Sequence, residues 1–161
     1  MCGIAGILNL NGPINPDELD RFTDSLTHRG PDGRGTFVDG NLGLGHRRLA
    51  ILDLSEAGKC PMPYGGYDGK RYWITFNGEV YNFLELRDEL KKLGYRFRTE
   101  TDTEVVVASY AHWGEDCLLR FNGMWALAIW DSLEKKLFLA RDRFGIKPLY
   151  FWGTRRFAFS S

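Results

Sequence analysis

The stretch that decides the fold is MWALAIWD, residues 124–131, which is apolar at every position from Trp125 to Trp130. A strand with one face in water alternates apolar and polar residues, so this strand should be covered on both faces. The other extended segments follow one another in runs, whereas a parallel βαβ fold would alternate them with helices. We therefore predict an α+β fold, a four-layer αββα sandwich of two antiparallel sheets between helices.

About seven further segments have the composition of strands. Residues 55–66 carry Pro and Gly without periodicity and are expected to form a mobile loop. The stretch 72–76 is aromatic and β-branched and should stop at Asn77-Gly78, a dipeptide typical of turns. The expected strands lie at Cys2–Leu10, at two segments within Thr36–Leu52 that flank Asp39-Gly40-Asn41, and at Tyr72–Phe76, Lys136–Arg141, Leu149–Trp152 and Phe157–Ser160.

Three helix starts carry capping signals. Asn15 can cap the first helix, Pro16 suits its first position, and Glu18 can reach back to the amide of the cap. The apolar stripe of this helix runs out at residues 28–30. The pairs Asn82-x-x-Glu85 and Thr101-x-x-Glu104 open two more helices, which should end near Gly94 and Gly114.

The composition favours a soluble, cytoplasmic protein with a small ligand. The 161 residues suit one domain, and 21 basic residues balance 21 acidic ones, so no charged surface for nucleic acid or anionic lipid is expected. No apolar stretch approaches the roughly 18 residues that a membrane span needs. Cys2, Cys60 and Cys117 are too far apart for a metal knuckle and are odd in number for disulfides, which indicates a reducing compartment and no metal site.

Cys2 raises the question of why a reactive thiol directly follows the initiator Met1. Initiator methionine is commonly removed before a side chain this small, which would leave a thiol and a free α-amine on one residue. Such an amine titrates at about pH 7.7–8.0, so a fraction is neutral at pH 7 and can take the thiol proton through a water. With Met1 attached, the amine is tied up in an amide. The structural alternative is that Cys2 is a small buried hydrophobe at the start of a strand.

Three other places, at the ends of strands or the start of a helix, could present side chains to a cavity. Arg48 could bind a carboxylate through two parallel hydrogen bonds, or be a solvated strand residue. Asp102 could bind an ammonium group, or belong to the cap of its helix. Asn77 and Gly78 offer an amide and an unobstructed N–H to an oxygen that develops negative charge, or form only a turn. The histidines could supply the base of a Cys-His pair, but none has an evident orienting partner: His28, His46 and His112.

Seven blocks in family order resemble the class II, N-terminal-nucleophile type of glutamine amidotransferase domain, most closely the glutaminase domain of glutamine-hydrolysing asparagine synthetase. The resemblance covers residues 1–161 and implies the N-terminal nucleophile hydrolase fold. The blocks are MCGIAGI, HRGPDGRG, LGHRRLAILD, FNGEVYN, TDTE, FNGMWALAIWD and RDRFGIKPLY.

The resemblance implies a role for each matching residue. Cys2 would be the nucleophile, with its own amine as the base once Met1 has gone. The Asn77 side chain and the Gly78 N–H would form an oxyanion hole. Arg48 would hold the α-carboxylate of glutamine, and its α-amino group would be held by two carboxylates, Asp102 and Glu79. Arg29 and Gly30 match the loop that closes over the substrate, and the backbone around Ile51 and Leu52 matches the rest of the pocket.

The implied reaction is hydrolysis of L-glutamine to glutamate and ammonia through a Cys2 thioester. The ammonia would pass to a C-terminal synthetase domain that makes asparagine from aspartate with ATP and Mg²⁺, whereas this domain would need no cofactor. That domain is absent here, and residues 157–161 look like a strand cut off while still apolar, so we expect a fragment of a longer polypeptide. A homodimer is compatible with the sequence.

Two other functions fit part of the pattern. One is an N-terminal-nucleophile amidohydrolase that acts on another amide, which would leave Arg48 and Asp102 without a purpose. The other is a non-catalytic domain, kept as a regulatory or packing partner, whose pocket binds glutamine or nothing.

Overall fold

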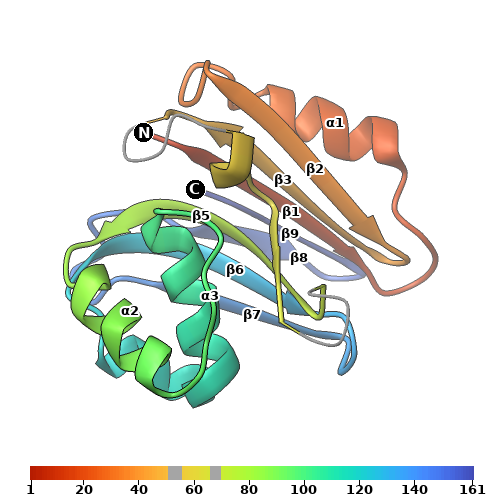
Figure 1. The fold of residues 1–161 in the computed structure, drawn as a ribbon. Helices are drawn as coiled ribbons and strands as arrows, with labels where there is room; N and C mark the ends of the chain where they lie inside the picture. Colours follow the sequence, from red (N-terminus) through yellow and green to blue (C-terminus); the bar gives the residue numbers. More distant parts are fainter. Residues whose placement is uncertain (51–55, 66–69) are drawn as a thin grey trace.

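The computed structural model describes residues 1–50, 56–65 and 70–161, which form two stacked antiparallel sheets with helices on both outer faces (Figure 1). The first sheet has the order β2-β3-β1-β9-β8 and the second β4-β5-β6-β7. Helix α1 (Pro16–Asp24) covers the first sheet, and α2 (Phe83–Lys92) and α3 (Asp102–Trp113) cover the second. The predicted αββα sandwich is confirmed.

The strand bounds place nearly every expected strand. The first sheet contains β1 (Gly3–Asn9), β2 (Gly33–Asp39), β3 (Leu42–Arg48), β8 (Tyr150–Gly153) and β9 (Arg156–Ser160). The second contains β4 (Met62–Tyr64), β5 (Tyr72–Val80), β6 (Gly123–Asp131) and β7 (Lys136–Arg141). Two short 3-10 helices, η1 (Glu56–Gly58) and η2 (Gly114–Leu119), complete the described elements.

Strand β6 is buried on both faces, as its sequence predicts. One set of side chains packs beneath α2 and α3, and the alternate set packs between the two sheets. The helix-facing set is Trp125, Leu127 and Ile129, and the set between the sheets is Ala126, Ala128 and Trp130. Because successive side chains of a strand point to opposite faces, both faces of β6 must be apolar. This strand is therefore the shared wall of two cores.

Two of the three expected caps are present. The Asn15 side chain accepts a hydrogen bond from the Asp17 N–H at 3.0 Å, and Thr101 Oγ1 accepts one from the Glu104 N–H at 3.2 Å. Glu18 does not reach back to its cap. Its carboxylate instead binds the guanidinium of Arg156 on β9, because an ion pair with a neighbouring strand competes with the local contact.

The Asn82 cap is wrong, although α2 does begin at Phe83. Asn82 has φ −92° and ψ 28°, outside the extended conformation that lets a cap side chain reach the first turn. Its amide nitrogen donates to the Arg120 carbonyl at 2.9 Å, and its oxygen accepts from the Asn122 N–H at 2.9 Å. The side chain therefore joins α2 to the segment before β6.

Two predictions about strands also need correction. Asn77-Gly78 does not end its strand, since β5 continues to Val80 and pairs Gly78 with Trp125 of β6. The long partner strand supplies ladder hydrogen bonds that override the local preference for a turn. The expected loop at 55–66 contains an edge strand, β4, where Pro63 is tolerated, and its ends, Ser55 and Gly66, lie outside the described residues.

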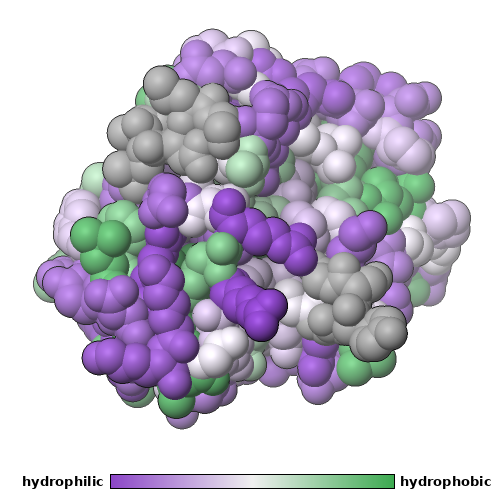
Figure 2. Space-filling model, in the orientation of Figure 1, coloured by the Kyte–Doolittle hydropathy of each residue, from purple (hydrophilic) through white to green (hydrophobic). Residues whose placement is uncertain are grey.

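The molecular surface in Figure 2 is mostly hydrophilic on the face shown, and its hydrophobic residues form separate groups. Within the described part of the chain, no helix has the length and apolarity that crossing a membrane requires.

Candidate functional site

A cavity of about 230 Å³ lies where the start of β1 and the ends of β3 and β5 meet the start of α3. Its volume is below the roughly 300–1,000 Å³ of sites for drug-sized ligands, so it suits a ligand about the size of an amino acid. It brings together six residues predicted for the site from separate parts of the sequence: Cys2, Arg48, Asn77, Gly78, Glu79 and Asp102.

Cys2 directly precedes β1, a central strand that pairs with β3 on one side and β9 on the other. Its thiol is within reach of the Leu49 backbone, whose N–H donates to Sγ at 3.4 Å and whose carbonyl accepts from it at 3.6 Å. Burial raises the pKa of the thiol, while the N-terminal ammonium and Arg48 act in the opposite direction. Cys2 lines the cavity and is partly exposed, whereas Cys60 and Cys117 are buried.

Asn77 and Gly78 are consecutive residues of β5, not a turn. The buried Asn77 amide donates one hydrogen bond, to the Ser161 hydroxyl at 2.8 Å. An amide nitrogen carries two hydrogens, so a second donor remains. A Cβ on Gly78 would stand 2.4 Å from the Met124 carbonyl oxygen on β6, so only glycine fits against the neighbouring strand.

Two carboxylates lie in the cavity wall. Asp102 is the first residue of α3 and only 5 % exposed, and its Oδ2 accepts the Val80 N–H at 2.9 Å. Burial raises the pKa of Asp102 to about 6, and the charge of Glu79 adds to this. Burial also raises the pKa of Glu79, while the charge of Lys147 lowers it. The helix cap is made by Thr101, so the Asp102 carboxylate faces β5 and the cavity.

Arg48 ends β3 and is half-buried in the same wall, so it is not a fully solvated strand residue. Gly58 of η1 packs against it, and a Cβ there would lie 2.5 Å from Nη2 of the guanidinium. The cavity thus holds a thiol, an Asn-Gly pair, a guanidinium and two carboxylates.

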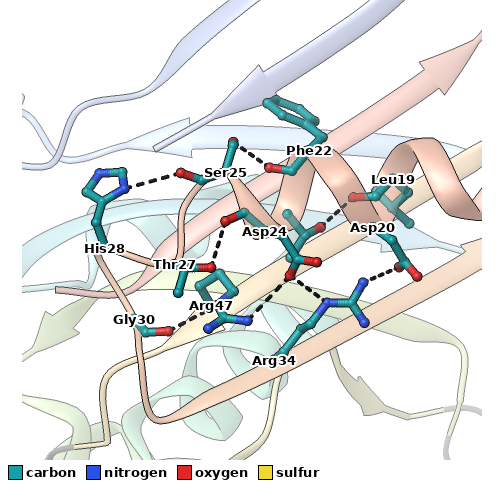
Figure 3. A network of polar contacts seen from close by, with 11 residues as sticks. Leu19, Asp20, Phe22, Asp24, Ser25, Thr27, His28, Gly30, Arg34 and Arg47 are labelled. Atoms are coloured by element: carbon teal, nitrogen blue, oxygen red, sulfur yellow. Dashed lines mark hydrogen bonds and ion pairs between the residues drawn. The ribbon is translucent and has the colours of Figure 1, made fainter.

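Arg29 and Gly30 do not line the cavity in this structure. The Arg29 Nε–H donates to the Cys2 carbonyl at 3.2 Å, so this side chain supports the backbone of Cys2. Figure 3 shows Arg47 between the Gly30 carbonyl, which its Nε–H contacts at 3.1 Å, and Asp24 at the end of α1. The other residues assigned to the pocket backbone, Ile51 and Leu52, lie outside the described residues.

None of the three histidines is placed as a partner for the thiol. His46 lines the cavity but is buried, and its Nε2–H donates to the Phe76 carbonyl at 3.0 Å. Burial lowers the pKa of His46 to about 4, so the ring is neutral and serves as a link between β3 and β5. His28 and His112 are exposed side chains bonded to the Ser25 carbonyl and the Tyr95 hydroxyl.

The structure adds residues to the site that the sequence reasoning did not assign. Ser161 touches the Asn77 amide, the Cys60 thiol lies in the wall, and Lys147 brings a buried ammonium group. Lys147 belongs to the block RDRFGIKPLY, which contributed to the resemblance without a role for its basic residues. A buried lysine cannot be distinguished from an exposed one by residue type alone.

A larger cavity of about 650 Å³ lies between α1 and the strands β8 and β9. Its lining includes aromatic residues such as Phe22, Phe151 and Trp152, and the Glu18 and Arg156 charges in it pair with each other. Its described lining contains no nucleophilic thiol, so its size does not make it the better candidate for an active site.

Comparison with known proteins gives a family and a fold. A family model described as a glutamine amidotransferase domain matches residues 1–161. A solved structure titled glutamine phosphoribosylpyrophosphate amidotransferase from B. subtilis, complexed with ADP and GMP, superposes with a TM-score of 0.82 over 99 % of this chain and 41 % of that chain. At 19 % identity this likeness shows the fold alone.

Curated relatives are longer than this chain. An asparagine synthetase [glutamine-hydrolyzing] 1 of Bacillus subtilis is 44 % identical over 94 % of the chain and 24 % of its own length. A putative asparagine synthetase [glutamine-hydrolyzing] 2 of Methanocaldococcus jannaschii is 41 % identical over 100 % of the chain and 34 % of its own length. "Amidase chry2" of Gibberella zeae is 36 % identical over 94 % of the chain and 24 % of its own length. The chain thus spans about a quarter to a third of these relatives, and with a family model matching along its full length it belongs to the glutamine amidotransferase domain family.

Proposed function

We propose that this chain hydrolyses L-glutamine to glutamate and ammonia through a thioester on Cys2. The observation that carries the proposal is that the second residue, a cysteine, lines the same cavity as an Asn-Gly pair, an arginine and two acidic residues. Arg48 binds the α-carboxylate in a two-pronged contact, and Asp102 with Glu79 binds the α-ammonium. This charge pattern selects a zwitterion.

The reaction begins when Met1 has been removed and the amine of Cys2 takes the thiol proton. The thiolate attacks the side-chain amide carbon, and the amide oxygen becomes an oxyanion held by Asn77 and Gly78. The oxyanion collapses, the α-ammonium of Cys2 gives its proton to the amide nitrogen, and the carbon–nitrogen bond breaks to release ammonia. Water, deprotonated by the same amine, then hydrolyses the thioester and releases glutamate.

The ammonia is proposed to serve asparagine synthesis in a longer protein. The support is that relatives of about 41–44 % identity are named glutamine-hydrolysing asparagine synthetases and that this chain spans only 24 % and 34 % of them. ATP and Mg²⁺ would bind in the remaining part of such a protein, with no cofactor in this domain. The cytoplasmic location and a homodimer stay predictions.

Intact-protein mass spectrometry tests the proposed function. Protein without Met1 is treated with 6-diazo-5-oxo-L-norleucine, a glutamine-like electrophile, with and without glutamine. We expect one covalent addition at Cys2, which glutamine blocks. Protein that lacks Met1 and gains no label would contradict catalysis and favour a non-catalytic pocket.

A second candidate, hydrolysis of a different amide, is favoured by the relative named "Amidase chry2". It predicts labelling of Cys2 that glutamine does not block. Glutamate release from glutamine by unlabelled protein, measured with a coupled dehydrogenase, separates the two reactions.

A further inference from the structure

The site contains a buried basic residue that the reaction just described does not use. Lys147, in the segment between β7 and β8, is 6 % exposed and lines the Cys2 cavity. A lysine is almost never buried unless it is paired with another group. We therefore expect the buried Lys147 ammonium to interact with an anionic group in the same cavity.

The backbone of Lys147 is fixed by a neighbouring buried carboxylate. Asp142 Oδ2 accepts the Lys147 N–H at 2.9 Å and the Trp125 N–H at 3.3 Å. Its Oδ1 accepts the N–H groups of Phe144 at 3.1 Å and Ile146 at 2.9 Å. Since Trp125 pairs with Gly78 in the second sheet, this turn is tied to the strand that carries the Asn-Gly pair.

Among the described residues, the ammonium of Lys147 has one hydrogen bond, to the Met1 thioether at 3.2 Å. A thioether is a weak, uncharged acceptor, and it leaves with Met1. The acid whose ionisation responds to Lys147 is Glu79: burial raises its pKa and the charge of Lys147 lowers it. The other charged or titratable groups of this wall are Asp102 on α3, His46 and Arg48 on β3, Cys60 before β4, Cys2 before β1 and the amino terminus at Met1.

We infer that Lys147 is a positioning residue of the glutamine site, whose ammonium keeps Glu79 as a carboxylate aimed at the α-ammonium of the substrate. Asp102 alone loses this charge as pH falls through about 6, the value to which burial and Glu79 raise its pKa, so a second carboxylate extends substrate binding to lower pH. Lys147 thereby offsets the repulsion between the two acids. The inference rests on the proposed function and adds a residue to it.

The first test compares the KM for glutamine in wild type, Lys147→Met and Lys147→Arg, in protein shown by mass to lack Met1. Lys147→Met keeps the length of the side chain and removes its charge. We expect KM to rise roughly five-fold at pH 7, as for a partly buried charge that loses a nearby opposite charge, with kcat nearly unchanged. The fall of 1/KM at acid pH should begin at a higher pH in Lys147→Met than in the wild type. Lys147→Arg should restore the wild-type KM and pH profile.

The matched control is Lys136→Met, which removes a surface lysine paired with Glu115 at 2.8 Å, away from the cavity. This variant should keep the wild-type KM at every pH. A Lys147→Met variant with the wild-type KM and pH profile overturns the inference.

A substrate analogue shows whether Lys147 acts through Glu79. Glutaramate has the amide and the carboxylate of glutamine but no α-amino group. Dissociation constants are measured by calorimetry in the Cys2→Ala background, with and without Lys147→Met. We expect Lys147→Met to raise the dissociation constant for glutamine and to leave that for glutaramate unchanged. Equal increases for both ligands would mean that Lys147 contacts the carboxylate or only supports the fold, and would refute the role through Glu79.

The proposed function and the role of Lys147 can be refuted separately. If wild-type protein without Met1 does not bind glutamine, the proposed function fails. If it binds and turns over glutamine while Lys147→Met behaves as wild type, only the inference about Lys147 fails.

Discussion

The thiol of Cys2 is not ionised in advance by its surroundings. Burial raises its pKa, and the contact with the Leu49 backbone and the nearby positive charges do not outweigh that effect. A thiol must lose its proton to act as a nucleophile. Since His46 is bonded to the Phe76 carbonyl, the proposed reaction takes its base from the amine that removal of Met1 would expose.

Replacing the nucleophile should separate binding from turnover. Cys2→Ala is expected to abolish glutamate release and to leave glutamine affinity nearly intact, because the α-carboxylate and α-ammonium contacts do not involve sulfur. Calorimetry measures binding and a coupled assay measures glutamate. Cys117→Ala, at a buried thiol in η2, is the control for turnover. Glutamate release by Cys2→Ala at the wild-type rate would show that another group is the nucleophile.

The acidity of Asp102 predicts how glutamine binding depends on pH. The ionised form binds the substrate ammonium, and burial raises the pKa of Asp102 to about 6. KM should therefore rise as pH falls through about 6, by up to about ten-fold per pH unit below it. Asp102→Asn should have a higher KM that varies less over this range. A wild-type KM that stays constant from pH 8 to pH 5 would exclude Asp102 from binding.

Residue types made Cys2, Arg48 and Asp102 candidates for the site, but a structural alternative stayed open for each, and the resemblance to a family supplied their expected roles. Residue types could not select Lys147 or Ser161. The position of Lys147 depends on Asp142, which holds a turn through four backbone amides, and such a contact is set by the tertiary fold. The burial of His46 likewise depends on the approach of two sheets.

At the scale of the element, β5 must serve two purposes at Gly78. It pairs closely with β6 and presents a backbone to the cavity. A side chain here meets the Met124 carbonyl and the Trp125 backbone, so the strands would have to separate.

Gly78→Ala should therefore lower both stability and turnover. We expect a loss of about 1–3 kcal/mol in the free energy of unfolding, as for overpacked sites, measured by urea denaturation. The control is Gly33→Ala, whose Cβ would meet Arg48 Cβ at an ordinary 3.4 Å and whose stability should change little. If Gly78→Ala were as stable as Gly33→Ala, the close fit between β5 and β6 would be refuted.

The elements that local chemistry defines were the predictable ones. The apolar run in β6 and the caps at Asn15 and Thr101 identify their own structure. The turn expected at Asn77-Gly78 and the loop expected at residues 55–66 failed for one shared reason, since in both places pairing with another strand overrides local preference. The predicted Asn82 cap failed because the side chain forms tertiary hydrogen bonds instead.

At the scale of the whole molecule, two buried groups have opposite effects on stability in acid. Burial lowers the pKa of His46 to about 4, so the unfolded chain binds its proton first and stability falls as pH drops from about 6.5 to 4. Burial raises the pKa of Asp102 to about 6, so the folded chain binds that proton first and stability rises as pH drops from about 6 to 4.

These effects should nearly cancel in the wild type and become visible in variants. Each amounts to about 3 kcal/mol at most, from shifts of about two pKa units. Between pH 7 and pH 4, the free energy of unfolding of Asp102→Asn should fall and that of His46→Gln should rise, as measured by urea denaturation at each pH. Parallel curves for both variants would contradict this balance.

The place of Cys2 at the head of a central strand has a practical consequence. Strands on both sides hold β1, so Cys2 stays at the cavity whatever residues precede it. An affinity tag at the amino terminus would cap the very nitrogen that catalysis requires and should give a well-folded but inert preparation. Tags belong at the other end, and the expression host must have enough methionine aminopeptidase to trim each molecule.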